Sequence, residues 1–128
     1  MEARIDLITI WTDDPGPMKE FYGNVLGFKI KNDLGQYIEF ENDGARFALC
    51  SREVMYAYSE GYKRQSSGQS FELAFRCRDL DDVDRSYKHI ISNGGNPVQE
   101  PEDMPWDQRT ALFSDPDGNI HEIFTDLK

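Results

Sequence analysis

The sequence predicts an α+β fold built from two βαβββ modules, and the evidence is an internal repeat. Asp6–Asp14 and Phe71–Asp79 both alternate along the chain as strands do, and they superpose at a shift of 65 residues. Asn42–Leu49 and Pro116–Ile123 superpose at a shift of 74, and each contains an Asp-Gly turn. Two independent matches indicate a duplicated unit, and we expect the two modules to form a curved half-barrel sheet.

The repeat divides the chain into a first module at residues 1–51, a linker or lid at 52–70 and a second module at 71–128. In each module a strand precedes a short amphipathic helix. Asp14 and Asp79 are expected to cap these helices, and Gly27 and Gly94 to end them. The remaining strands are expected near Lys29–Asn32, Gln36–Glu41 and Arg46–Ser51 in the first module and near Pro97–Gln99, Arg109–Ser114 and Asn119–Thr125 in the second.

The segment between the modules, Arg52–Ser70, is too long and polar for a simple hairpin. Within it Gln65–Gln69 is typical of a flexible linker. Its three tyrosines, among them Tyr56, and a methionine suit a lid that closes on a ligand. Packing of the same side chains against the sheet is the alternative.

The composition is acidic, with 24 Asp and Glu against 14 Lys and Arg and a net charge of −10. This balance argues against nucleic acid or an anionic membrane as a partner, because both require a basic surface. No apolar stretch suggests a signal peptide or a membrane span. Cys50 and Cys77 lie in strand-like runs without metal-type spacing, so we expect reduced thiols and a cytoplasmic protein.

Several short motifs stand at characteristic separations along the chain. They are Asp13-Asp14, Phe21-Tyr22 with Val25-Leu26-Gly27-Phe28, the helix entry Asp79–Asp84, and Asp115-Pro116-Asp117-Gly118-Asn119 with Glu122. Together they resemble the vicinal oxygen chelate superfamily over essentially the whole chain. That superfamily holds glyoxalase I, extradiol dioxygenases, fosfomycin-resistance enzymes and bleomycin-resistance proteins. The resemblance is specific for the fold and much less so for the chemistry.

In the catalytic branches of this superfamily four strand residues hold a divalent metal, and the resemblance places them at Leu7, Ala48, Glu72 and Glu122. Leucine and alanine have no lone pairs, so only the two carboxylates remain as metal ligands. A tight Zn²⁺ or Ni²⁺ site needs about three good protein ligands. We therefore expect either no metal or a weakly bound divalent ion: Mg²⁺, Mn²⁺, Ni²⁺ or Zn²⁺. His121 adjoins Glu122 and is expected to face the other side of the sheet.

The resemblance to bleomycin-resistance proteins implies a small molecule, positively charged in that branch, bound in a cavity at the interface of a homodimer. Such a cavity needs aromatic walls and a few polar anchors. The residues expected to contact the ligand are Leu7, Trp11, Ala48, Tyr56, Arg76, Trp106 and Phe124. Arg76 shares a strand face with Glu72, so it is equally a candidate to neutralise that carboxylate.

The alternative function is a glyoxalase-like lyase or isomerase with Glu122 as general base. Two carboxylates beside one apolar cavity raise the pKa of one of them, which leaves one acid and one base. Glu72 and Glu122 are therefore the candidate catalytic residues. A dioxygenase is not expected, because it needs two histidines with a carboxylate and neither first-strand position is histidine.

Overall fold

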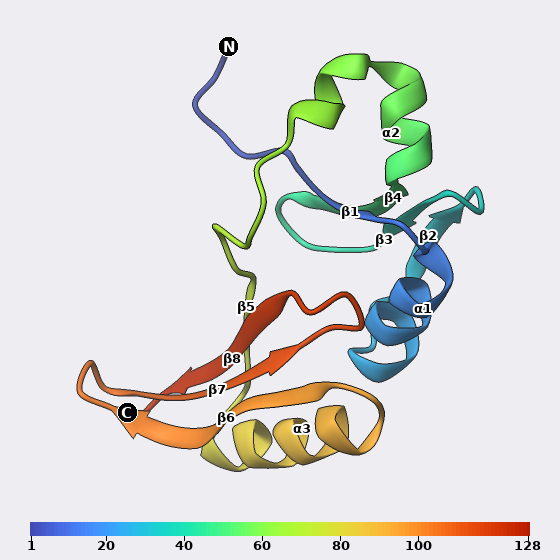
Figure 1. Ribbon diagram of the computed structural model, residues 1–128. Helices are drawn as coiled ribbons and strands as arrows, with labels where there is room; N and C mark the ends of the chain where they lie inside the picture. The colour runs from blue at the N-terminus through green and yellow to red at the C-terminus, as the bar shows by residue number, and fades with distance from the viewer. The chain divides into compact units, whose positions relative to one another are not determined.

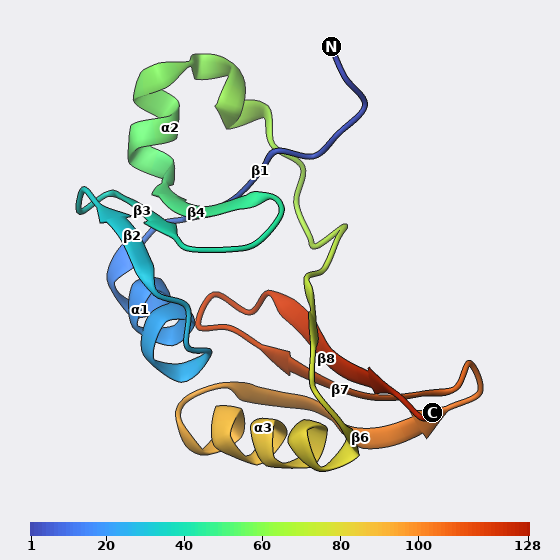
Figure 2. The same cartoon turned by 180° about the vertical axis from the view of Figure 1, so that it is seen from behind.

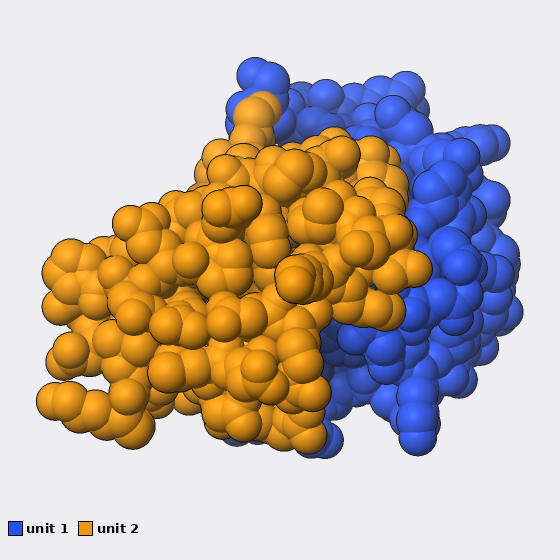
Figure 3. Space-filling view, turned by 90° about the horizontal axis from the view of Figure 1, so that it is seen from below, with its two compact units in different colours: residues 1–67 blue, residues 68–128 orange.

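The structure is a computed structural model that describes residues 1–128. It divides into two compact units, Met1–Ser67 and Gly68–Lys128, which Figure 3 colours separately. No helix is long and apolar enough to cross a membrane.

Unit 1 is a four-stranded sheet with helices at its two sides (Figures 1 and 2). In chain order its elements are β1 (Leu7–Thr12), α1 (Pro15–Glu20) with a π-helical turn (Phe21–Val25), β2 (Ile30–Asp33), β3 (Tyr37–Phe40), β4 (Arg46–Ser51), α2 (Arg52–Tyr58) and a 3₁₀ helix (Glu60–Arg64). The sheet order is β1-β4-β3-β2, with β1 parallel to β4 and the other pairs antiparallel. Tyr22, Phe40 and Phe47 pack against one another in its core.

Unit 2 repeats this topology with β5 (Ala74–Arg76), α3 (Leu80–Ser92), β6 (Asn96–Met104), β7 (Gln108–Ser114) and β8 (Ile120–Asp126). Its sheet order is β5-β8-β7-β6, again with one parallel pair followed by antiparallel ones. Helix α3 packs against β6, β7 and β8 and buries Val83, Tyr87 and Ile90. The predicted α+β fold with two βαβββ modules is confirmed.

The strand register agrees with the two sequence offsets. Thr9 lies opposite Ala48 in unit 1, and Ala74 lies opposite Glu122 in unit 2. The offsets of 65 and 74 residues carry the first pair onto the second. Ala48 and Glu122 therefore occupy corresponding places in the two sheets.

The helix ends form as their residues predict. The Asp14 carboxylate accepts a hydrogen bond from the Gly16 N–H (3.2 Å), and the Asp79 carboxylate accepts one from the Asp82 N–H (2.8 Å). Gly27 and Gly94 have φ of 90° and 109°, a backbone conformation that favours glycine after a helix. The predicted caps and stops are confirmed.

Two expectations about element boundaries are wrong. The strand expected over Phe71–Asp79 is only Ala74–Arg76, because side chains replace its first ladder bonds, as described below. The strand expected at Pro97–Gln99 extends over Asn96–Met104. It tolerates Pro97 and Pro101 because β6 is an edge strand with shifts in register.

The segment Arg52–Ser70, predicted as a linker or lid, is largely helical. The Ser51 hydroxyl caps α2 by accepting from the Val54 N–H at 3.2 Å. The negative charge of Glu53 in the first turn interacts favourably with the helix dipole. Within the expected flexible stretch, Gln65 is bonded to Tyr56 and Arg52, and Gln69 is bonded to Ile120.

Candidate functional site

Strand β8 separates two kinds of surface in unit 2. His121, Ile123 and Thr125 are buried on the side of α3, whereas Glu122 and Phe124 are half-buried on the opposite face. His121 therefore faces away from Glu122, as its sequence position predicts. The face that carries Glu122, together with Glu72 before β5, is the candidate site.

Two carboxylates lie close together on this face. Burial raises the pKa of Glu122, and the nearby charge of Glu72 raises it further. Glu72 is exposed, whereas Glu122 is half-buried. The pair is therefore a place where a proton or a cation is held more readily than by an isolated surface carboxylate.

Arg76 and Phe124 form a stacked pair further along the same face. The Arg76 guanidinium lies 4.7 Å from the centroid of the Phe124 ring, and it also pairs with Asp126 at 3.0 Å. Arg76 therefore has Asp126 as its ion-pair partner, and it forms no ion pair with Glu72. The stacked arginine side chain remains 60% exposed.

Trp106 joins this surface through a chain of hydrogen bonds. Its indole N–H donates to Gln108 Oε1 at 3.1 Å, and Gln108 Nε2 donates to Asp126 at 3.2 Å. Asp126 in turn accepts from Arg76. The hydrogen bonds from Gln108 and Arg76, together with the charge of Arg76, lower the pKa of Asp126. Trp106, Arg76 and Phe124, predicted separately as ligand contacts, thus lie in one connected cluster in unit 2.

An open groove of about 600 Å³ begins at this cluster. It runs from the ends of β5 and β8 to the start of α3, and its lining includes Arg76, Asp126 and Leu80. Cys77 also lines it, but burial raises the pKa of this thiol, and the pKa of Cys50 is raised in the same way. Neither cysteine has the thiolate character of a reactive site.

The corresponding positions of unit 1 carry no carboxylate. Leu7 is 42% exposed at the start of β1, and Ala48 is fully buried in β4. Beside Ala48 lies Glu39, whose carboxylate accepts hydrogen bonds from Arg46 at 2.7 and 3.1 Å. The Arg46 bonds, with help from Tyr37 and Lys31, hold the pKa of Glu39 at about 2 against the opposing effect of burial.

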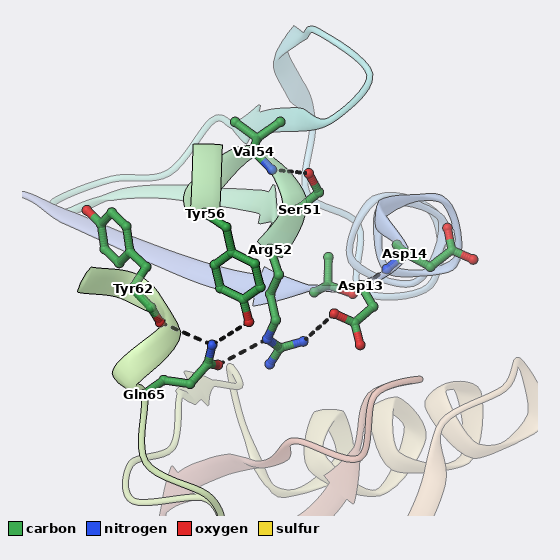
Figure 4. Close-up of polar contacts among 9 residues, drawn as sticks. Asp13, Asp14, Ser51, Arg52, Val54, Tyr56, Tyr62 and Gln65 are labelled. Atoms are coloured by element: carbon green, nitrogen blue, oxygen red, sulfur yellow. Dashed lines mark hydrogen bonds and ion pairs between the residues drawn. The ribbon is translucent and has the colours of Figure 1, made fainter. Parts of the chain in front are cut away.

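The helical segment after β4 packs against Trp11 (Figure 4 shows its polar contacts). The Tyr62 ring meets the Trp11 ring edge-on at 5.2 Å. Arg52 joins the segment to β1 by donating to Gln65 Oε1 (3.1 Å) and to Asp13 (3.2 Å). Gln65 donates to the Tyr56 hydroxyl at 2.7 Å. Trp11 and Tyr56 therefore both contact this helical segment of unit 1.

The metal that the fold implies does not fit the residues present. Of the four corresponding positions, Leu7 and Ala48 offer no donor atom, and Glu39 beside Ala48 is committed to Arg46. No group of three or more His, Cys, Asp or Glu side chains in the chain is arranged to hold a metal ion. Two carboxylates with waters suit at most a weakly held hard cation.

Sequence reasoning missed Gln69, Gln108, Asp126 and the Glu39–Arg46 pair. Asp126 could have been predicted from the sequence, because it continues the alternation of Glu122 and Phe124 on one strand face. Gln69 gave no signal, since it stands in the polar run Gln65–Gln69 that is typical of a linker. Glu39 and Arg46 belong to different strands, and only the register shows that they meet.

Comparison with known proteins adds a family and a fold. The sequence model of the Glyoxalase/Bleomycin resistance protein/Dioxygenase superfamily matches residues 4–123. The uncharacterized protein YraH of Bacillus subtilis (strain 168) is 33% identical over 112 residues, 82% of this chain and 84% of that protein.

Solved structures agree on the fold. A glyoxalase/bleomycin resistance protein/dioxygenase family enzyme from Burkholderia phytofirmans PsJN has a TM-score of 0.85 at 21% identity, covering 95% of this chain and 98% of that one. A lactoylglutathione lyase from Agrobacterium tumefaciens has a TM-score of 0.72 at 20% identity, covering 96% and 93%. At these identities the likeness concerns the fold alone.

Proposed function

This chain belongs to the Glyoxalase/Bleomycin resistance protein/Dioxygenase superfamily, and we propose that it binds a positively charged small molecule through the Glu72–Glu122 pair, without a tightly held transition metal. The observation that carries the proposal is the pair of carboxylates on one face of unit 2, where Glu122 is half-buried and where burial and the charge of Glu72 raise the pKa of Glu122. Two carboxylates that repel each other beside an apolar surface are stabilised in their charged form when a cation lies between them. A bound cation lowers the pKa of Glu122 again.

The neighbouring cluster supports the same role. Phe124 shares a strand face with Glu122 and has Arg76 stacked on it, and the 62%-exposed Trp106 belongs to the same hydrogen-bonded cluster as Arg76. Aromatic faces attract organic cations through the ring quadrupole, by about 0.5–1 kcal/mol at exposed sites. A small organic cation with an aromatic or otherwise flat part therefore fits this face better than an inorganic ion does.

A second candidate function follows from the same pKa. A glutamate whose pKa is raised above its ordinary value is better suited to serve as a general acid or base. Lyase or isomerase chemistry with Glu122 as the base that moves a proton is therefore the alternative. It requires a substrate with an acidic C–H held against Glu122, and Glu72 would then keep the proton affinity of Glu122 high.

We also expect a homodimer. Several large apolar side chains are substantially exposed in the single chain, among them Leu7 (42%), Phe71 (65%) and Trp106 (62%). Monomers seldom leave many such side chains in water. Light scattering during gel filtration measures the mass directly, and a monomer at micromolar concentration contradicts this part of the proposal.

A thermal-shift screen tests the binding function. The library holds organic ammonium compounds, matched neutral analogues and α-oxo thioesters, each with chelator or with Mg²⁺, Mn²⁺, Ni²⁺ or Zn²⁺. We expect stabilisation by ammonium compounds in chelator, lost in Glu122→Gln, with Glu41→Gln as an exposed control. Stabilisation that requires a metal, or that is equal for the neutral analogues, refutes the proposal. Turnover of a thioester that Glu122→Gln abolishes supports the alternative.

A further inference from the structure

The segment before β5 runs beside β8 without joining the sheet. The β5–β8 register places Leu73 opposite His121. In a regular parallel ladder, Leu73 would accept from the Glu122 N–H and donate its own N–H to the Ile120 carbonyl. The first bond is present at 2.9 Å, but the second is absent, because both of its partners are bonded elsewhere.

The Gln69 side-chain amide occupies this place beside Ile120. Its Oε1 accepts from the Ile120 N–H (2.7 Å), and its Nε2 donates to the Ile120 carbonyl (2.7 Å) and to the Phe71 carbonyl (2.8 Å). Two carbonyl partners and one N–H partner fix which end of the amide carries the nitrogen. The Gln69 side-chain amide therefore forms the hydrogen bonds that a backbone peptide group would form between Phe71 and Ile120.

His121 takes the other half of the missing bond. Its Nδ1 accepts from the Leu73 N–H at 3.1 Å, so Nδ1 is unprotonated and the other nitrogen, Nε2, carries the hydrogen. Nε2 lies 3.8 Å from the buried Asp115 carboxylate. Asp115 in turn accepts from the backbone N–H groups of Asp117 and Asn119, so the ring is held against the turn before β8.

These contacts hold the backbone on both sides of Glu72, at Phe71 and at Leu73. Glu72 adjoins Leu73, whose N–H is held by His121 and whose carbonyl is held by the Glu122 N–H. The inserted amide keeps the chain apart from β8 at Ile120, and a shallow groove of about 360 Å³ is lined there by Phe71, Glu72 and Ile120. The side chains of Gln69 and His121 thus take the two partners of the missing Leu73–Ile120 bond beside this groove.

We propose that Gln69 and His121 are positioning residues that hold Glu72 beside Glu122 by replacing the Leu73–Ile120 ladder bond. The proposal rests on the function proposed for the Glu72–Glu122 pair, and it assigns roles to two residues outside that pair. It also explains why a histidine precedes Glu122 on the buried face of β8. Neither residue touches the ligand in this scheme.

Nuclear magnetic resonance of the full chain in chelator tests the proposal without any ligand. Amide hydrogen exchange follows the Leu73 and Ile120 N–H groups, and the carboxyl carbon of Glu122 reports its titration. Four variants are compared: Gln69→Ala, His121→Phe, which keeps ring volume without an acceptor, His121→Asn, which returns an oxygen near the Nδ1 position, and the exposed control Gln36→Ala.

We expect Ile120 exchange to accelerate at least about tenfold in Gln69→Ala, the effect of losing a bond of about 1.4 kcal/mol. Leu73 should accelerate similarly in His121→Phe and recover in His121→Asn. In both Gln69→Ala and His121→Phe, the Glu122 titration should move towards lower pH, since Glu72 is released, and His121→Asn should restore it.

Two results overturn the proposal. The first is rapid exchange of both amides in the unsubstituted protein, which would mean that the side-chain bonds do not form. The second is faster exchange in the variants with an unchanged Glu122 titration, which would make both residues purely structural. If His121→Phe does not fold, Gln69→Ala decides, because Gln69 is exposed. Failure of the ligand screen alone overturns the proposed function and leaves these outcomes intact.

Discussion

Replacing Glu39 by glutamine tests whether the one carboxylate near Ala48 is a structural counter-ion and not a metal ligand. Glu39 is 6% exposed and pairs with Arg46 through two hydrogen bonds. Its pKa is about 2, against 4.5 for an ordinary glutamate. One pKa unit corresponds to about 1.4 kcal/mol, so the whole shift sets an upper bound of roughly 3 kcal/mol.

The expected loss is smaller than this bound, because the Arg46 and Lys31 side chains are 57% and 60% exposed and solvent screens their charges. We expect Glu39→Gln to lower the free energy of unfolding by about 1–2 kcal/mol at pH 7. The folded pKa is depressed, so this stability is present above the unfolded value of 4.5 and is lost as the pH falls towards 2. At pH 3 less than half of the difference should remain.

Urea denaturation at pH 7 and pH 3 measures both quantities, with Glu41→Gln as the matched control on an exposed carboxylate. The control should differ from the unsubstituted protein by less than about 0.5 kcal/mol at either pH. Equal stability of Glu39→Gln and the unsubstituted protein at pH 7 refutes the ion-pair reasoning. A difference that persists undiminished at pH 3 refutes the assigned cause.

Three further substitutions test the scaffold. Asp115→Ala removes a buried acceptor of three hydrogen bonds in its turn and should cost about 3 kcal/mol, measured by chemical denaturation. Gly95→Ala would press a Cβ against the Ile90 side chain and backbone, and a loss of about 1–3 kcal/mol in the same assay is expected. Arg52→Ala should cost less than about 1 kcal/mol but expose Trp11 to water, seen as a red shift of its fluorescence.

The repeat in the sequence was sufficient to predict the fold, because strand alternation and two constant offsets specify the topology. The register pair Thr9 and Ala48 maps onto Ala74 and Glu122 through those offsets. Helix caps were equally predictable, since Asp14 needs only local geometry to act. The sequence pattern therefore predicts the regular, repeated part of the chain well.

The site was predictable only where it follows from strand parity. Glu122 and Phe124 share a face because their positions differ by two. The shortened β5 was not predictable, since Gln69 bonds to Ile120 across 51 positions of the sequence. The same holds for the helical segment after β4, whose contacts between Arg52 and Gln65 form only when both helices are in place.

Calorimetric titration of the best ammonium ligand from the screen, in excess chelator, tests the central claim most directly. The account predicts unchanged affinity in chelator and a loss of about tenfold or more in Glu122→Gln, because the ligand charge then loses its half-buried partner. Glu72→Gln should weaken binding as well. Binding that disappears in chelator and returns with one equivalent of a transition metal would contradict the account, as would full affinity in Glu122→Gln.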